Sequence, residues 1–171
     1  MLLTMETSEL FNSHNKDEYP PSHTAEHLLN QLMVRMFGCS RSTNAHIERK
    51  KSKISYILNR KPDRKTEKEI ENKMNELIAE DMPVTYETVM LSDLTEETTG
   101  PDGKYEGVDI DRLPANVSDA VRIVRIGDYD ICPCIGKHVR STSQIGRFEL
   151  LGTNWDETNH SFRIRYKVVE N

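Results

Sequence analysis

The sequence predicts an α+β protein in which an antiparallel β-sheet carries helices packed on one of its faces. Two amphipathic helical patterns and several alternating strand patterns indicate this class, and hairpin-sized spacings connect most of the strands. The 171 residues are 36% hydrophobic, which is enough for one core. We therefore expect a single domain over 1–171, whose N-terminal extension at 1–18 offers one candidate edge strand at Met1–Met5.

The first helix is expected after Pro20 and Pro21, with Ser22 as its N-cap. Leucines and methionines then recur at helical spacing until Gly38 ends the run. His23 and His27 therefore lie on one face of this helix, one turn apart.

A second amphipathic helix is expected from Thr66-Glu-Lys-Glu69, which has the form of a capping box. Its apolar stripe ends before Pro83, and residues 84–90 alternate as a strand. Residues 91–120 contain few apolar residues and read as a long loop with one short helical turn. Residues 161–168 show the cleanest alternation, with one apolar and one basic face.

Residues 121–126 and 129–134 flank Gly127-Asp128 and are expected to form a β-hairpin. Its second strand delivers Cys134 to a turn that ends at His138. Cys132 points to the same face of the strand as Cys134, so either sulfur could be a metal ligand. Only Cys134 has the four-residue spacing to His138.

Two ligand pairs, His23 with His27 and Cys134 with His138, together offer three imidazoles and one thiolate, a set that tetrahedral zinc accepts. Each pair alone has an ordinary interpretation. The histidines could be one exposed and one packed residue, and the cysteine a buried thiol beside a surface histidine. The presence of both pairs favours a metal site assembled across the fold.

The segment His-Thr-Ala-Glu-His-Leu-Leu at 23–29 resembles the H-[ST]-A-x-H-L-L segment of the editing domains of alanyl- and threonyl-tRNA synthetases. Residues 134–146 resemble their C-x-x-x-H-V-x-x-T-x-x-I-G segment, and 81–84 and 121–127 are similar in order and spacing. The likeness spans 20–150 and implies a Zn²⁺-containing aminoacyl-tRNA deacylase with an editing-domain-like fold. The chain is too short to hold a synthetase catalytic domain as well, so we expect a free-standing module.

Several positions depart from the family pattern. Ile135 and Lys137 replace a glycine and a threonine of C-G-G-T-H, and Ser143 and Gln144 replace a glycine and a glutamate of T-G-E-I-G. Glu26 stands where a small or neutral residue is usual. These positions would shape the amino-acid pocket.

Three residues near the ligands are candidates for catalysis: Thr24, Glu26 and Lys137. Thr24 and Glu26 share the helix turn with the histidines, and either could contact the substrate or orient a metal-ligating side chain. A helix-capping role is the alternative for Thr24. Lys137 could attract a phosphate or the ester carbonyl, or be an exposed loop lysine.

Charge is unevenly distributed along a chain whose net charge is −5. Residues 41–73 contain eleven Lys or Arg and five Asp or Glu, whereas the remainder contains 12 and 23. We expect this basic segment to contact the tRNA acceptor end, with a solvated loop and helix face as the alternative. The candidate tRNA-binding residues are Arg49, Lys50, Lys51 and Lys53.

The sequence therefore leaves three functional hypotheses. The first is a trans-editing deacylase of seryl-tRNA(Ala), with seryl-tRNA(Thr) next within that class. The second is a non-catalytic zinc-binding, tRNA-binding module, and the third is a metal-dependent hydrolase of a small ester or amide. The odd number of cysteines and the lack of a signal-like or membrane-spanning stretch lead us to expect a cytoplasmic protein.

Overall fold

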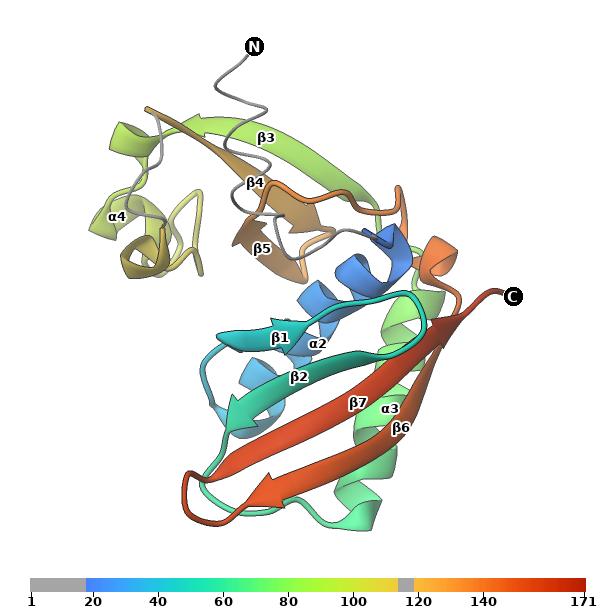
Figure 1. The fold of residues 1–171 in the computed structure, drawn as a ribbon. Helices are drawn as coiled ribbons and strands as arrows, with labels where there is room; N and C mark the ends of the chain where they lie inside the picture. The colour runs from blue at the N-terminus through green and yellow to red at the C-terminus, as the bar shows by residue number, and fades with distance from the viewer. Residues whose placement is uncertain (1–17, 114–118) are drawn as a thin grey trace.

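The computed structural model describes residues 18–113 and 119–171 (Figure 1). The candidate edge strand at Met1–Met5 lies outside the described residues. No helix in the described part of the chain is long and apolar enough to cross a membrane.

The larger sheet has four antiparallel strands in the order β1-β2-β7-β6. Their bounds are β1 Asn44–His46, β2 Ser52–Ile57, β6 Arg147–Asp156 and β7 Ser161–Val169. Helices α2 (Pro20–Phe37) and α3 (Arg64–Ala79) cover one face of this sheet, as Figure 1 shows. The α+β class with antiparallel strands and packed helices is therefore confirmed.

The remaining strands form a second sheet in the order β3-β4-β5, rather than extending the first. Their bounds are β3 Val84–Met90, β4 Ala120–Ile126 and β5 Asp130–Pro133. Val84, Val124 and Ile126 of this sheet belong to the same core as α2 and the larger sheet. Helix α2 contacts both β5 and β7 and therefore lies between the two sheets. Its apolar surface is buried against both of them rather than against one continuous sheet.

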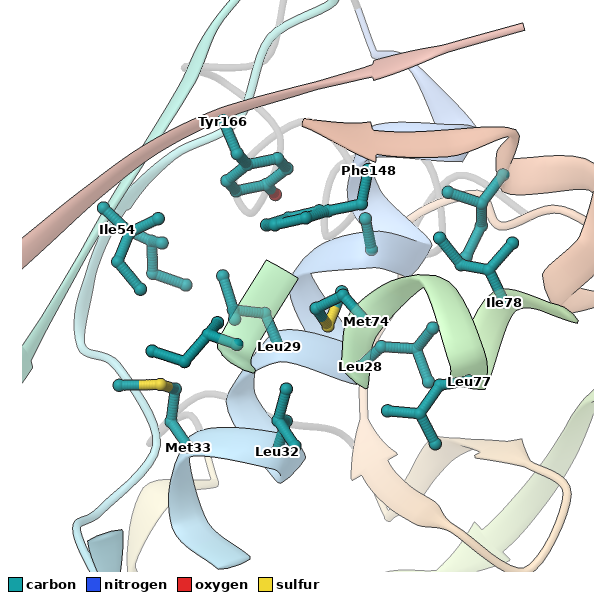
Figure 2. Packing of buried hydrophobic residues seen from close by; sticks show 14 of the residues in the cluster. Leu28, Leu29, Leu32, Met33, Ile54, Met74, Leu77, Ile78, Phe148 and Tyr166 are labelled. Carbon is teal, nitrogen blue, oxygen red and sulfur yellow. The ribbon is translucent and has the colours of Figure 1, made fainter. Parts of the chain in front are cut away.

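The main core joins both helices to the larger sheet (Figure 2). Its fully buried side chains include Leu28, Leu29, Met33, Ile54, Met74, Phe148 and Tyr166. The Phe148 and Tyr166 rings stack with centroids 5.1 Å apart, which locks β6 against β7. Burial of α2 on two sides holds its first turn at a defined place relative to the smaller sheet.

Both helix starts differ from the prediction. Helix α2 begins at Pro20 with Tyr19 as N-cap, and Ser22 is buried inside the helix. Proline is favoured at the first helical position because its fixed φ suits the helix and no donor is lost there. Helix α3 begins at Arg64, because the Asp63 side chain accepts a hydrogen bond from Thr66 N–H. The predicted end of the first helix at Gly38 is confirmed by its left-handed φ of 66°.

The sequence patterns missed β1, β2 and β6. In β6 a register shift between Leu150 and Gly152 breaks the alternation, so no period-two pattern runs through the strand. Strand β2 turns Ser52 inward together with Ile54 and Tyr56, which obscures its apolar face. The hairpin of β4 and β5 and the alternation of β7 agree with prediction.

Residues 91–113 are the described part of the segment predicted as a loop at 91–120, and they contain three short helical turns: Leu91–Asp93, Glu96–Thr99 and Ile110–Arg112. Leu94, Tyr105 and Val108 from this part pack on Val121 and Ile123 of β4 in a second small core. Residues 91–113 therefore cover the face of the smaller sheet that points away from α2.

Candidate metal centre

Four potential metal ligands meet at the junction of α2 and the smaller sheet. His23 and His27 project from the first two turns of α2, Cys134 follows directly after β5, and His138 ends the turn that leaves it. One donor atom from each residue lies within 4.8 Å of the donors of the others. The structure thus brings together the two ligand pairs singled out in the sequence, and the cluster can hold a metal ion.

The turn from Cys134 to His138 is held from below by Arg122 of β4. Its Nε donates to the Cys134 carbonyl over 2.7 Å and its guanidinium also donates to the Gly136 carbonyl. Gly136 is buried, and a Cβ at this position would overlap the His23 ring. The retained glycine of the Cys-Ile-Gly-Lys-His segment therefore leaves room for an imidazole.

Each of the three imidazoles has an oxygen facing its Nδ1 atom. His23 Nδ1 lies 3.1 Å from the Lys137 carbonyl, and His138 Nδ1 lies 3.0 Å from the Thr24 hydroxyl. His27 Nδ1 faces the Asp130 carboxylate at 3.7 Å. An oxygen in this position can accept a proton from Nδ1, and a ring with its proton there would leave the Nε2 lone pair for a metal.

The inward nitrogens and the sulfur face one another. His23 Nε2 lies 3.4 Å from Cys134 Sγ. His138 Nε2 is buried and has no hydrogen-bond partner among residues 18–113 and 119–171. An unpaired buried nitrogen is costly in free energy unless something coordinates it. Three nitrogens and one sulfur are also the donor types that zinc accepts, so the residues present fit the ion.

Two of the four residues, Cys134 and His138, have the protonation states that bind a metal. Burial alone would raise the pKa of Cys134, but the positive charge of His27 and the imidazoles of His138 and His23 beside the sulfur hold this pKa well below its usual value. Burial lowers the pKa of His138 to about 4, so its imidazole is neutral at pH 7. A thiolate and a neutral imidazole are the forms that bind metal.

The electric field at the centre favours a positive charge. Burial opposes protonation of His27, yet the Cys134 thiolate and the Asp130 carboxylate raise its pKa well above the usual value. Burial would likewise raise the pKa of Asp130, but its contacts with His27 and Arg41 lower it. Negative groups on both sides of His27 therefore make the centre attractive to a cation.

Asp130 is a site residue that the sequence reasoning missed. Its side chain is fully buried and accepts hydrogen bonds from Arg41 over 2.6 and 3.3 Å and from Gln31 over 3.1 Å. A pattern could have indicated it, because alternation along β5 places Asp130 on the same face as Cys132 and Cys134. Arg41, counted in the basic segment, is thus an internal partner of Asp130.

The three candidate catalytic residues occupy different environments. Thr24 is fully buried, and its hydroxyl accepts from Val139 N–H at 3.2 Å while facing His138. It positions the 138–139 segment. The side chain of Lys137 is exposed, and its main chain makes the contacts, with its carbonyl facing His23 and its N–H donating to Glu18 at 2.5 Å.

Glu26 is half-buried and has neither a hydrogen bond nor an ion pair within the part of the chain that the structure describes. It stands three residues after His23 on α2. Burial and then the Cys134 thiolate act most strongly on the pKa of His23, which is raised overall, and the charge of Glu26 adds to that rise. The Glu26 carboxylate therefore lies close to the centre and is not bonded to any described residue.

Two departures from the family pattern have local structural roles. The Ser143 hydroxyl donates to the Asp81 carboxylate, and Gln144 Oε1 accepts from Arg140 N–H at 2.9 Å. Both side chains stabilise the turn around Thr142–Ile145. Cys132 lies outside the four-residue cluster, and burial raises the pKa of its thiol.

The basic segment 41–73 does not form one surface. Arg49, Lys50 and Lys51 are exposed on the loop between β1 and β2, with Lys53 just inside β2; these four residues are called the basic tip below. The Arg49 guanidinium lies over the Tyr19 ring, 4.8 Å from its centroid. Tyr19 precedes His23 by one helical turn. The bases that precede and begin α3 lie at the opposite end of α2, as Figure 1 shows.

Tyr86 and Arg122 also border the centre and were not predicted. The Tyr86 hydroxyl accepts from His138 N–H at 3.2 Å, and the Arg122 guanidinium lies 4.5 Å from the Tyr86 ring centroid. Tyr86 reaches the centre through the pairing of β3 with β4, and Arg122 through its place on β4 beside β5.

Comparison with known proteins supports the resemblance to editing domains. A family model described as the threonyl and alanyl tRNA synthetase second additional domain matches residues 121–163. The alanyl-tRNA editing protein AlaX-L of Pyrococcus horikoshii is 29% identical over 129 residues, covering 75% of this chain and 29% of that protein.

Two alanine–tRNA ligases are similar as well. The Methanococcus vannielii enzyme is 29% identical over 143 residues, covering 83% of this chain and 15% of that protein. The Treponema denticola enzyme is 32% identical over 133 residues, covering 74% and 20%. The chain spans less than a third of the length of each of these three relatives, and the resemblance to alanyl-type editing domains is confirmed.

The two cysteines near the centre provide a matched test of the ligand assignment. We expect Cys134→Ala to reduce bound divalent metal from about one ion per chain to nearly none, because it removes the thiolate. Cys132→Ala should retain the metal, since Cys132 lies outside the cluster. Metal content of the purified variants, measured by plasma mass spectrometry, checks this. Loss on replacing Cys132 with retention on replacing Cys134 would reverse the assignment.

Proposed function

We propose that this chain is a zinc-dependent trans-editing hydrolase that deacylates mischarged aminoacyl-tRNA, with seryl-tRNA(Ala) as its substrate. The observation that carries the proposal is the convergence of His23, His27, Cys134 and His138, each imidazole with an oxygen facing its Nδ1 atom. The resemblance to AlaX-L, whose name describes an alanyl-tRNA editing protein, supports the choice of substrate.

The four residues would hold zinc in a complete tetrahedral shell of three nitrogens and one sulfur. Zinc, when bound, can polarise a carbonyl or a water molecule or orient the groups around it. His138 is fixed at its ring by Thr24 and at its main chain by Tyr86, which favours a centre that keeps all four protein ligands. With all four residues bound to a cation, the 134–138 turn and the first turn of α2 would be held together beside the substrate.

We assign proton handling to Glu26. Hydrolysis adds a water oxygen to the ester carbonyl and breaks the bond to the ribose oxygen, so one proton must leave the water and one must reach the ribose hydroxyl. Glu26 is the half-buried carboxylate near the centre that lacks an ion-pair partner among the described residues. It can accept the first proton and return it to the leaving oxygen.

The basic tip supplies the proposed tRNA contact. Arg49, through its contact with Tyr19, places the tip beside the start of α2, one turn from His23. Phosphates of an acceptor end would therefore lie next to four positive side chains while the ester reaches the centre. This local charge offsets the overall charge of −5, which by itself would suit a small ester or amide better than RNA.

A non-catalytic tRNA-binding module is less favoured because Ser143 and Gln144 serve the turn rather than alter the centre. Seryl-tRNA(Thr) remains the second substrate within the class. We place the activity in the cytoplasm, where a reducing environment would keep Cys39, Cys132 and Cys134 as the free thiols seen in the structure.

We expect the purified protein to release serine from seryl-tRNA(Ala) faster than from seryl-tRNA(Thr), and chelator-treated protein to lose most of this activity until zinc is restored. The physical reason is that the imidazoles and the thiolate need the cation to hold the turn in place. Ester loss from radiolabelled substrates measures both effects. Absence of release from seryl- and glycyl-tRNA substrates would remove the proposed reaction, and chelator-insensitive release would remove the metal from it.

We also expect charge reversal at the basic tip, in a Lys50→Glu/Lys51→Glu double variant, to raise KM for aminoacyl-tRNA about tenfold or more at low salt with little change in kcat. The salt dependence of KM should weaken, because fewer phosphate contacts remain.

The matched control is Lys61→Glu/Lys65→Glu, which changes the net charge equally at the other end of α2 and should leave KM nearly unchanged. Equal effects of the two double variants would show that net charge, rather than the tip, governs binding.

A further inference from the structure

An exposed aromatic ring stands beside the metal centre on β3. Tyr86 is 47% exposed, although it shares a sheet face with Val84 and Val124, which pack in the main core. Figure 1 shows why: β3 starts next to the first turn of α2 and then runs away from the helix. Among the described residues, no helix therefore covers β3 on this face beyond Val84, although Val124 of the neighbouring β4 is buried in the main core.

The Tyr86 ring is held in place from two directions. The guanidinium of Arg122 lies over it, 4.5 Å from the centroid, and its hydroxyl accepts from His138 N–H at 3.2 Å. Arg122 also holds the carbonyl of Cys134, so the ring and the ligand turn share one support. A ring ordered in this way loses little conformational entropy when a flat partner binds it.

The position of the ring suits one part of the proposed substrate. The Tyr86 ring centroid lies 6.3 Å from that of His138, immediately outside the ligand cluster. In an aminoacylated nucleoside, the ribose separates the ester carbonyl from the base by the width of one sugar. When the ester of such a substrate lies at the centre, its base therefore lies about as far from the ligands as the Tyr86 ring does.

We propose that Tyr86 is a stacking platform for the purine base of the nucleoside that carries the ester. Aromatic side chains stack on nucleobases through their π-faces, and Arg122 behind the ring adds a cation on the opposite face. This assignment rests on the proposed function, because it takes the ester to be attached to a terminal nucleoside. Tyr86 would thus bind the base, the part of the substrate that the four ligands do not contact.

The test compares two hydrolysis-resistant probes on the purified full chain. One is 3′-deoxy-3′-(serylamino)adenosine, and the other is the serylamino derivative of methyl riboside, which lacks the base. Calorimetry gives both dissociation constants, and we expect the base to improve affinity about tenfold or more. Tyr86→Leu should reduce this ratio to near one, whereas Tyr86→Phe, which keeps the ring, should preserve it.

Ile57→Ala is the control, since Ile57 is 65% exposed on the other sheet and should leave the ratio unchanged. Because any disturbance of His138 affects both probes alike, the ratio isolates the contact with the base. A ratio near one in the unmodified protein, or a ratio unchanged by Tyr86→Leu, would overturn the assignment. Deacylation of seryl-tRNA(Ala) by the same unmodified sample tests the proposed function separately, so the two failures can be told apart.

Discussion

The contact between the first turn of α2 and the turn that follows β5 is the constraint on which the candidate site depends. His23 and His27 come from one side of it, and Cys134 and His138 come from the other, more than a hundred residues later. The contact exists because α2 is packed between two sheets, which fixes its start against the smaller one. Gly136 shows how tight the fit is, since even a methyl group there would meet the His23 ring.

A second layer of residues ties the ligands to the core. Asp130, buried with Arg41, faces His27, and the buried Thr24 hydroxyl faces His138. These groups orient the imidazoles and lower the free energy of a positive charge at the centre. Binding of a cation would therefore stabilise the junction of the two sheets as well as the site. The fold and the candidate metal centre therefore share the same supporting contacts.

The sequence was sufficient to pair His23 with His27 and Cys134 with His138, because helical and turn spacing are local properties; their role as metal ligands stays a prediction. It was insufficient for Asp130, Tyr86 and Arg122, whose contacts arise only from the packing of β3, β4 and α2. The charge count predicted one basic surface over residues 41–73. In the fold, Arg41 is instead paired with the buried Asp130, and the basic tip lies beside the start of α2. Likewise, the register shift within β6 hides a strand whose alternation would otherwise be evident.

Zinc-edge X-ray absorption spectroscopy on the purified protein identifies the atoms bound to the ion. We expect one zinc with three nitrogen neighbours and one sulfur neighbour, at about 2.0–2.1 and 2.3 Å. A shell made of oxygen alone, or one with two sulfurs, would contradict the assignment of His23, His27, Cys134 and His138 as the ligands.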